Sequence, residues 1–202
     1  SLPRREGVVK IATLAAPVDV ALDARAIPTA RGESFVDVLR AQGYLHAQER
    51  FFQMDLLRRS AAGELAALVG ERALPADRAQ KAFGYRELAG SLLQTALPTE
   101  QAAWLHAYAE GVNAGLEDLG ARPPEYWLLG ATPQPWTAED SVLAALTLYT
   151  MLSNNDSYER AQGVMHATLP EELYTFLTPS SSRYDRPVLS ATLADPTAGY
   201  VP

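Results

Sequence analysis

Along most of the chain, apolar residues recur every three to four positions, which is the spacing of one face of an α-helix. The N-terminal part differs from this pattern. Residues 8–11 form a short apolar run, and residues 18–23 read Val-Asp-Val-Ala-Leu-Asp, which is the alternation of a half-buried β-strand. We therefore predict an α+β fold with N-terminal strands in residues 1–33, a helical domain over residues 34–178 and an extended tail over residues 179–202.

Capping residues indicate where the first helix begins. Ser34 followed by Asp37 is a capping-box pattern, and apolar Phe35 and Val38 lie between and after them. A helix is therefore expected to begin at this point. Gly43 is expected to interrupt it, because glycine is unfavourable in a helix interior. The segment after Gly43 continues as a helix rich in aromatic residues and arginines.

Further helices are indicated by residues that start or stop them. Thr99 is expected to cap a long helix that Gly120 ends, since glycine is common just beyond a helix C-terminus. Thr137 with Asp140 forms a second capping pattern, and Pro170 occupies the first turn of a short helix. The chain is therefore predicted to be mostly helical after residue 34.

One segment breaks the helical pattern near the end of the chain. The apolar run "LAALTLYTML" is followed by "SNNDSYERAQG", in which Ser, Asn and Asp compete with the helix by bonding backbone groups. The helix is expected to end or kink there. Its end carries Met151, Asn154 and Asn155 beside Asp156 and Glu159. This arrangement fits the wall of a binding site and equally fits an ordinary corner between two helices.

The predicted strands are too few for a stable sheet. Two strands alone would leave unpaired edges, so we expect them to complete a sheet whose other strands lie in another chain. The tail after residue 178 is rich in Ser, Pro and Thr, which is typical of a solvated linker or of an arm that lies on a partner. Both features predict one chain of a two-chain protein.

Composition excludes several classes of function. The formal net charge of the 202 residues is −7, which disfavours a general affinity for nucleic acid. No stretch approaches the roughly 18 consecutive apolar residues of a membrane span. The chain has no cysteine, which excludes disulfides, thiol nucleophiles and cysteine metal sites. Neither a phosphate-binding glycine loop nor a nucleophile-elbow motif is present.

Histidines are the main candidates for chemistry. His46 and Glu49 lie three positions apart, so on a helix they would share a face as an acid–base pair, as metal ligands or as a structural pair. The structural pair is the more common outcome. His46, His106 and His166 are the three histidines of the chain and are a weaker candidate for a zinc site, because His166 falls in a loop-like region.

Three segments together resemble a known family. Residues 43–70, "GYLHAQERFFQMDLLRRSAAGELAALVG", closely resemble the hallmark segment of penicillin-acylase-type enzymes. "AYAEGVNAG" at 107–115 and "PPEYWLLG…PQPWTAEDSV" at 123–142 match further blocks of that family. The resemblance covers roughly residues 15 to 165. The sequence looks like the α chain of an N-terminal nucleophile (Ntn) hydrolase.

The resemblance implies a specific organisation. Such enzymes are similar to one another in being made as a single precursor, from which a spacer is removed to give an α and a β chain. The implied fold is an αββα sandwich, in which the N-terminal strands of this chain complete the sheet of the β chain. The implied nucleophile is the serine that begins the β chain, so no catalytic residue is expected here. The implied location is the periplasm or the outside of a bacterium.

The implied activity is hydrolysis of the amide of N-acylated small molecules, either penicillins or N-acyl-homoserine lactones. By resemblance, the kinked helix end lines the acyl pocket, and the aligned residues place Tyr149, Met151, Leu152, Asn154 and Asn155 in the substrate site. Family members that bind phenylacetyl groups carry Arg and Phe where this chain has the two asparagines. An aliphatic acyl chain is therefore a second possibility, and a non-catalytic helical scaffold or binding subunit is the alternative from another class.

The resemblance also implies a structural calcium ion at the subunit interface and no organic cofactor. The matching glutamate is Glu159, with Asp156 as the competing residue. Calcium takes six to eight oxygen ligands, so most of them would come from the β chain. The resemblance further gives His46 a structural role and leads us to expect that Arg58 and Arg59 pair with acidic partners at the subunit interface.

Overall fold

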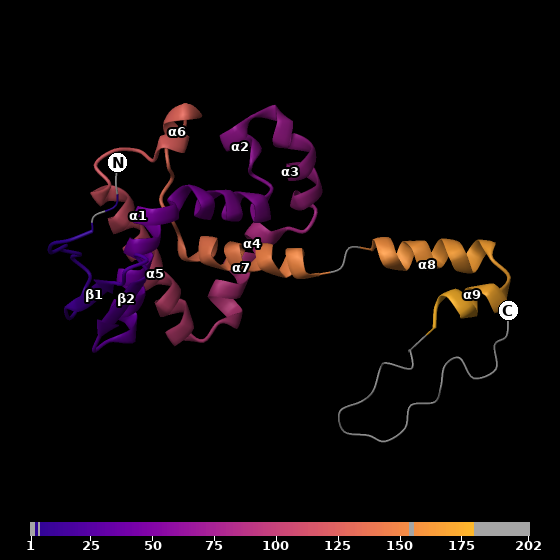
Figure 1. The fold of residues 1–202 in the computed structure, drawn as a ribbon, viewed down its shortest axis with the longest axis horizontal. Helices are drawn as coiled ribbons and strands as arrows, with labels where there is room; N and C mark the ends of the chain where they lie inside the picture. Colours follow the sequence, from indigo (N-terminus) through magenta and orange to yellow (C-terminus); the bar gives the residue numbers. More distant parts are fainter. Residues whose placement is uncertain (1–2, 4, 154–155, 180–202) are drawn as a thin grey trace, which may run out of the picture. The chain divides into compact units, whose positions relative to one another are not determined.

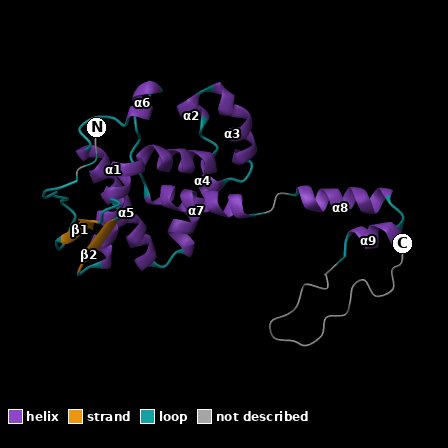
Figure 2. Cartoon of the chain, viewed as in Figure 1, coloured by secondary structure: helices purple, strands orange, loops and turns teal. Residues whose placement is uncertain are grey.

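The computed structural model describes residues 3, 5–153 and 156–179, and it divides the chain into two compact units, Ser1–Met151 and Leu152–Pro202. The first unit contains a β-hairpin and the helices from α1 to most of α7, and the second contains α8 and α9 (Figure 1). The predicted tail from residue 180 onward lies outside the described residues. Most of the described chain is helical, as expected (Figure 2).

The hairpin consists of β1, Val18–Leu22, and β2, Pro28–Gly32, paired antiparallel with Val18 opposite Gly32. The carboxylate of Asp23 holds the connecting loop, because it accepts hydrogen bonds from the backbone N–H groups of Arg25 and Ile27, each at 2.8 Å. The strand predicted at residues 18–23 is thereby confirmed.

The strand predicted at residues 8–11 is wrong, and β2 was not predicted. The apolar run at 8–11 has no partner strand among the residues that the structure describes, and an isolated extended segment gains no ladder hydrogen bonds. β2 escaped prediction because Pro28 and Gly32 resemble turn residues. Proline is nevertheless tolerated at the first position of an edge strand, where its missing N–H is not needed.

Helix α1, Phe35–Ala62, begins where the capping pattern predicted. The Ser34 hydroxyl accepts a hydrogen bond from the Asp37 N–H at 3.4 Å, and the helix ends at Gly63 in the left-handed conformation (φ 65°). The predicted break at Gly43 is wrong, because the helix runs straight through it. The departure from helical dihedral angles falls at Arg50 instead (φ −152°, ψ 30°).

Gly43 serves close packing against α5, Thr99–Asp118. A Cβ atom at Gly43 would lie 2.2 Å from the carbonyl oxygen of Tyr108, and one at Gly111 would lie 1.9 Å from the carbonyl oxygen of Arg40. Both distances are far inside van der Waals contact, so only glycine allows the two helix backbones to approach this closely. We call this contact the α1–α5 seam.

The remaining elements are short helices and the long α7. They are α2 (Ala66–Val69), the 3₁₀-helix η1 (Glu71–Ala73), α3 (Leu74–Lys81), α4 (Tyr85–Ser91), the π-helix η2 (Leu92–Ala96), α6 (Pro124–Leu128), α7 (Ala138–Leu152), α8 (Ser157–Thr168) and α9 (Glu171–Leu177). As predicted, α7 follows Thr137 and ends before the Ser-Asn-Asn-Asp segment. The short helix α9 follows Pro170, also as predicted. Thr99 is the first residue of α5 rather than its cap.

The apolar core lies in the first unit. One cluster joins Phe51 and Met54 of α1 to Val112 of α5 and to Tyr126 and Trp136 of the segment between α5 and α7. A second cluster joins the end of α1 to α4 and to Leu143 of α7. In the second unit, by contrast, none of the described residues 156–179 is buried. The first unit therefore has a core of its own, whereas the described helices of the second have none.

Candidate functional site

The predicted acyl-pocket residues lie on an open surface at the end of α7. Tyr149 is 65% exposed, Met151 72% and Leu152 85%, and the neighbouring Leu148 is 55% exposed. The other two predicted residues, Asn154 and Asn155, lie outside the described residues. Such a concentration of exposed apolar side chains on one helix end is typical of an interaction or ligand surface.

The polar residues of the same helix end face the opposite way. The Thr147 hydroxyl lies 3.0 Å from the Leu57 carbonyl oxygen of α1, and the Thr150 hydroxyl lies 3.1 Å from the Tyr85 hydroxyl of α4. Surface helices normally turn polar residues outward and apolar residues inward. The last turns of α7 reverse this arrangement, because their threonines face the chain's own core and their apolar side chains are exposed.

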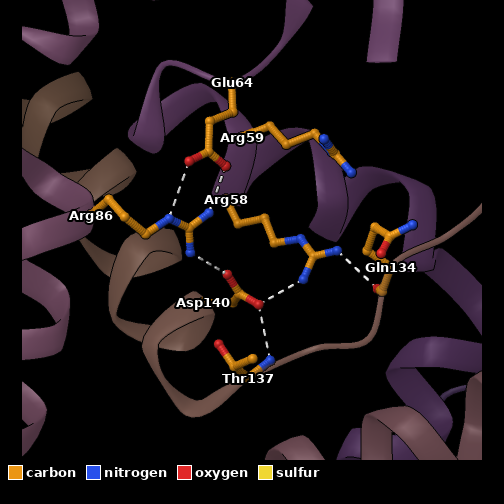
Figure 3. A pocket seen from close by; sticks show the side chains of 7 residues that line it. All are labelled: Arg58, Arg59, Glu64, Arg86, Gln134, Thr137 and Asp140. Atoms are coloured by element: carbon orange, nitrogen blue, oxygen red, sulfur yellow. Dashed lines mark hydrogen bonds and ion pairs between the residues drawn. The ribbon is translucent and has the colours of Figure 1, made fainter. Parts of the chain in front are cut away.

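The other end of α7 is anchored by a buried network of charges (Figure 3). Asp140 accepts hydrogen bonds from Arg58 at 2.6 Å, from Arg86 at 2.9 Å and from the Thr137 backbone N–H at 2.9 Å. Arg86 also pairs with Glu64 at 2.6 Å. Burial by itself would raise the pKa of Asp140, but the charge of Arg58 and these hydrogen bonds outweigh burial and lower the pKa below its ordinary value.

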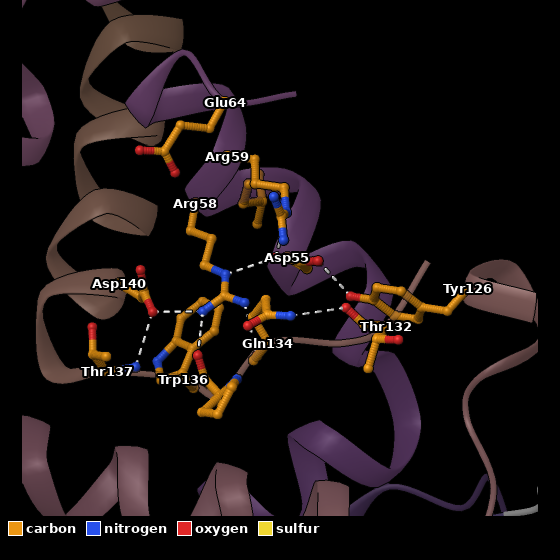
Figure 4. Close-up of polar contacts among 12 residues, drawn as sticks. Asp55, Arg58, Arg59, Glu64, Tyr126, Thr132, Gln134, Trp136, Thr137 and Asp140 are labelled. Carbon is orange, nitrogen blue, oxygen red and sulfur yellow. Dashed lines mark hydrogen bonds and ion pairs between the residues drawn. The ribbon is translucent and has the colours of Figure 1, made fainter. Parts of the chain in front are cut away.

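A second carboxylate completes the network on the α1 side (Figure 4). Asp55 accepts from Arg58 at 2.7 Å, from Arg59 at 2.8 Å and from the Tyr126 hydroxyl at 2.6 Å. Burial raises the pKa of Tyr126, and the hydrogen bond to Asp55 adds to the rise, so the phenol stays protonated as the donor. The guanidinium of Arg58 also lies over the Trp136 ring, 5.1 Å from its centroid.

The network gives both arginines acidic partners within this chain. Arg58 pairs with Asp55 and Asp140, and Arg59 pairs with Asp55. Asp55 lies one turn away on the same helix, whereas Asp140 is brought to Arg58 by the fold. A hollow of about 220 Å³ beside the network is lined by Arg58, Arg59, Glu64, Arg86, Gln134, Thr137 and Asp140. Its lining holds three arginines, and the carboxylates of Asp55, Glu64 and Asp140 form ion pairs with them.

His46 and Glu49 do not pair with each other. The Nδ1 atom of His46 lies 2.8 Å from the Tyr108 hydroxyl, and Glu49 pairs with Arg5 at 3.3 Å. Burial lowers the pKa of His46, and the nearby charge of Arg50 lowers it further. Burial also raises the pKa of Tyr108 to about 12. A neutral imidazole bonded to a neutral phenol ties α1 to α5, and it offers no acid–base pair with Glu49.

Metal-binding candidates are sparse. Within the part of the chain that the structure describes, no three His, Asp or Glu side chains come together as a metal site, so the weak three-histidine candidate is not assembled. Glu159 is an exposed residue in the first turn of α8. Asp156 is already paired with Arg160 one turn along. Glu159 is therefore the more available of the two predicted calcium ligands.

Sequence reasoning missed the inward-facing threonines and the roles of the buried Asp55 and Asp77. Asp77 of α3 accepts hydrogen bonds from the backbone N–H groups of Leu65 and Ala66 at 2.9 and 2.7 Å, and so caps α2 from outside that helix. The available signal for the threonines was their spacing: Thr147 and Thr150 lie three apart within an otherwise apolar helix. That spacing places both hydroxyls on one face.

The described chain is thus mostly helical and exposes apolar side chains at the end of α7. The family model for penicillin amidase matches residues 17–190. The chain therefore belongs to the penicillin amidase family. Among the described residues, no helix is long and apolar enough to cross a membrane.

Curated relatives include both substrate classes considered above. The penicillin acylase 2 proenzyme of Pseudomonas sp. (strain SE83) is 39% identical over 142 residues, which are 70% of this chain and 18% of that protein. The acyl-homoserine lactone acylase QuiP of Pseudomonas fluorescens (strain Pf0-1) is 34% identical over 192 residues, 95% of this chain and 23% of that protein. The chain thus spans only about a fifth of the length of these relatives.

A solved structure has the same fold. The thermostable penicillin G acylase from Alcaligenes faecalis matches with a TM-score of 0.73 and 24% sequence identity. The match covers 89% of this chain and 100% of that chain. The α+β fold predicted from the sequence is therefore confirmed.

Proposed function

We propose that this chain is the α chain of a heterodimeric amidohydrolase that cleaves the amide bond of N-acylated small molecules. Membership of the penicillin amidase family supports this activity, and the relatives' names supply penicillins and acyl-homoserine lactones as the two substrate classes. The chain covers a small share of proenzyme-length relatives but all of one chain of a solved acylase, which supports processing of a longer precursor.

The reaction would be carried out by the rest of the protein. In this proposal, the hydroxyl of a serine at the start of the β chain attacks the amide carbonyl carbon, and its own α-amine takes the hydroxyl proton. The amine part of the substrate leaves with a proton, and water then hydrolyses the serine ester to release the carboxylic acid. The role of the α chain is to shape the pocket that binds the acyl group.

The observation that carries the proposal is the reversed polarity of the end of α7. Tyr149, Met151 and Leu152 point away from the chain's own core, where an acyl chain held between the two chains would contact them. Asn154 and Asn155 complete the proposed substrate site. Flexible and largely aliphatic side chains favour a long acyl chain over a phenylacetyl group, because they conform to a flexible ligand.

The test uses the full-length protein, expressed as its precursor. The N-terminus of any second chain is sequenced, and acid release is measured from phenoxymethylpenicillin and from long-chain acyl-homoserine lactones. Tyr149→Ala and Leu152→Ala are compared with Leu128→Ala, a control at a similarly exposed leucine of α6. We expect the first two variants, and not the third, to lower kcat/KM by roughly tenfold, because each loses apolar contact with the acyl group.

A partner chain that begins with a residue other than Ser, Thr or Cys, together with no turnover of either substrate, would overturn the enzymatic proposal. That result would support the alternative of a non-catalytic scaffold or binding subunit. If Tyr149→Ala, Leu152→Ala and Leu128→Ala all lower kcat/KM equally, the acyl pocket lies elsewhere.

We also propose a structural calcium ion at the junction of the two chains, with Glu159 as the ligand from this chain. The exposure of Glu159 and the pairing of Asp156 with Arg160 support this choice. One carboxylate supplies at most two oxygens, so the remaining ligands of a six- to eight-coordinate ion must come from the rest of the protein. Replacing Glu159 by Ala should lower the calcium content of the purified protein, whereas Glu172→Ala, at an exposed position of α9, should not. Unchanged calcium in Glu159→Ala would move the site to Asp156 or remove it.

The proposed location is the periplasm or the outside of the cell. The absence of cysteine is compatible with an oxidising compartment, where free thiols would be a liability. Fractionation of the native organism with an antibody to this chain tests the proposal, and recovery of the mature chain in the cytosol would contradict it.

A further inference from the structure

Thr150 joins the last turn of α7 to α4. The hydroxyl oxygen of Thr150 lies 3.1 Å from the hydroxyl oxygen of Tyr85, which is the first residue of α4. Thr150 is half-buried, whereas Met151 and Leu152, which follow it and end the helix, are exposed. Thr150 is therefore the last residue of α7 that the core of this chain partly covers.

The two contacts of the Thr150 hydroxyl assign its proton. Its oxygen also lies 3.0 Å from the carbonyl oxygen of Leu146, which can only accept a hydrogen bond. A threonine hydroxyl has a single proton, but it can donate and accept at the same time. Both contacts are satisfied when Thr150 donates to Leu146 and accepts from Tyr85. The phenol of Tyr85 is thus the donor that links α4 to the end of α7.

The hydroxyl of Thr147, one turn earlier, faces two acceptors instead. It lies 3.0 Å from the carbonyl oxygen of Leu57 and 3.1 Å from that of Leu143, so its one proton is shared between them. Thr147 is buried, and so is Leu143, which means that packing also holds this turn. At the half-buried Thr150 the hydrogen bond carries a larger share of the attachment.

Tyr85 is fixed by its own surroundings. Its side chain is 9% exposed and belongs to the second core cluster, together with Ala89 and Leu143. The centroid of its ring lies 5.4 Å from that of Phe83. Because the ring is packed among these neighbours, the core determines where its hydroxyl lies. Tyr85 can therefore hold the end of α7 in place.

An anchor at Thr150 determines where the neighbouring side chains point. One turn of an α-helix has about 3.6 residues, so successive residues are about 100° apart around the axis. With Thr150 directed toward α4, Tyr149 and Met151 lie about 100° to either side of it, and Leu152 points about 160° away. If the anchor were lost, the last turn would be free to rotate or unwind, and these apolar side chains would move with it.

We propose that Tyr85 is a positioning residue for recognition of the acyl chain. Its hydroxyl holds Thr150 and thereby sets the directions of Tyr149, Met151 and Leu152, while Tyr85 itself does not touch the substrate. The proposal rests on the proposed function, because it identifies what orients the acyl site named there. A loosely held pocket wall makes fewer of its contacts at once, so it distinguishes less well between long and short acyl chains.

The acyl preference of the full-length protein is the first measurement. Hydrolysis of dodecanoyl- and butanoyl-homoserine lactone is compared in Tyr85→Phe, which removes the donor hydroxyl alone. We expect the ratio of kcat/KM for dodecanoyl to that for butanoyl to fall about fivefold through KM, with kcat within about twofold, because one hydrogen bond to the pocket wall is lost.

Ser141→Ala is the matched control. Ser141 lies near the start of α7 and accepts a hydrogen bond from the indole N–H of Trp136 at 3.0 Å. Its variant therefore removes one side-chain hydrogen bond from the same helix without touching the last turn. The ratio of the two kcat/KM values should stay at the level of the wild type. An equal fall in Ser141→Ala and Tyr85→Phe would contradict a specific role of Tyr85.

The partner of Tyr85 is tested in the same assay. Thr150→Val removes the hydroxyl at nearly constant volume and should lower the ratio as much as Tyr85→Phe does. Thr150→Ser keeps the hydroxyl and should retain most of the preference. The double variant Tyr85→Phe/Thr150→Val should be no worse than either single variant, since both remove the same bond. Additive losses would show that the two residues act separately, and would overturn the proposal.

Amide hydrogen exchange gives a measurement that does not depend on turnover. The amide protons of Met151 and Leu152 should exchange about fivefold faster in Tyr85→Phe than in the wild type, because the last turn opens more often. Ser141→Ala should leave their exchange unchanged. Unchanged exchange in Tyr85→Phe would overturn the anchor, whether or not the protein is active.

These outcomes separate the inference from the proposed function. Absence of turnover in the wild type would reject the proposed function, and with it the role of Tyr85 in acyl recognition. Turnover with a preference that Tyr85→Phe leaves unchanged would reject this inference alone and retain the enzyme. Hydrolysis of phenoxymethylpenicillin but of neither lactone would likewise reject the inference and retain an amidohydrolase.

Discussion

The two halves of α7 belong to different environments although they form one continuous helix. In the first half, Asp140 and Leu143 are 2% and 0% exposed. Asp140 pairs with Arg58 and Arg86, and Leu143 packs against residues of α1 and α4. In the second half, Met151 and Leu152 are 72% and 85% exposed, whereas Leu146 packs against the second core cluster and the two threonines face inward. The chain's own core thus extends along α7 as far as Thr147, and the apolar side chains beyond it are exposed.

The largest effect on stability is expected at the charge network near the start of α7. Replacing Arg58 by Ala would leave Asp55 and Asp140 buried with fewer cationic partners, so the free energy of unfolding should fall by about 3–5 kcal/mol. Denaturant unfolding of the full-length protein measures the change. Arg25→Ala, at an exposed arginine of the hairpin loop, is the control and should stay within about 0.5 kcal/mol. Equal losses in both variants would mean that the network does not stabilise the fold.

A pair of leucine substitutions compares the two halves directly. Leu143→Ala removes a fully buried side chain and should lower the free energy of unfolding by about 2–5 kcal/mol, with the acyl preference unchanged. Leu152→Ala should lower the free energy of unfolding by less than about 1 kcal/mol, since its side chain contributes little to this chain's core. The same variant should raise the KM for substrates with long acyl chains. A reversal of the two stability effects would contradict the division of α7.

Glycine substitutions extend the comparison to α1 and α5. Gly111→Ala places a Cβ atom 1.9 Å from the Arg40 carbonyl oxygen, so the helices must move apart, at a cost of about 1–3 kcal/mol. Gly90→Ala is the control, because a Cβ atom there meets nothing within 4 Å. Alanine at that position should be neutral or stabilise α4 by up to about 1 kcal/mol. Thermal melts of both variants decide, and similar Tm changes would argue against a close seam.

The smallest effect concerns pH. The pKa of His46 is lower in the folded protein than its ordinary value of about 6.5, so the unfolded chain takes up the proton first as the pH falls. The free energy of unfolding should therefore decrease below about pH 6.5, until the folded imidazole is protonated too. His46→Gln should flatten this slope, because the variant lacks the group that takes up the proton. Parallel curves for wild type and His46→Gln would refute the contribution.

The buried contacts between distant parts of the chain were the less predictable feature from the sequence. The capping patterns at Ser34 and Thr137 correctly located the starts of α1 and α7, because a cap depends on residues only three positions apart. Asp55 lies at helical i,i+3 spacing from Arg58, but the second partner of Arg58 did not follow from any local pattern. Asp140 lies 82 positions away and is brought to it only by the fold. The helix break predicted at Gly43 was wrong for the same reason, since the role of this glycine is set by Tyr108 of another helix.

The candidate site was easier to locate than to complete. The change from apolar to Ser, Asn and Asp residues correctly indicated the end of α7, where helix propensity and side-chain competition act locally. The outward direction of Tyr149 and Met151 was not visible in the sequence, because it depends on Thr147 and Thr150 reaching Leu57 and Tyr85. Two further residues of the proposed site, Asn154 and Asn155, lie outside the described residues.

The α1–α5 seam also affects how the protein is made. His46 and Tyr108, which bond across it, are 62 positions apart. At a translation rate of about 5–20 residues per second, α1 waits several seconds on the ribosome before α5 is synthesised. During that time the backbone at Gly43 cannot make its close contact with Tyr108. The side of α1 that packs against α5 therefore stays uncovered on the nascent polypeptide until α5 has been made.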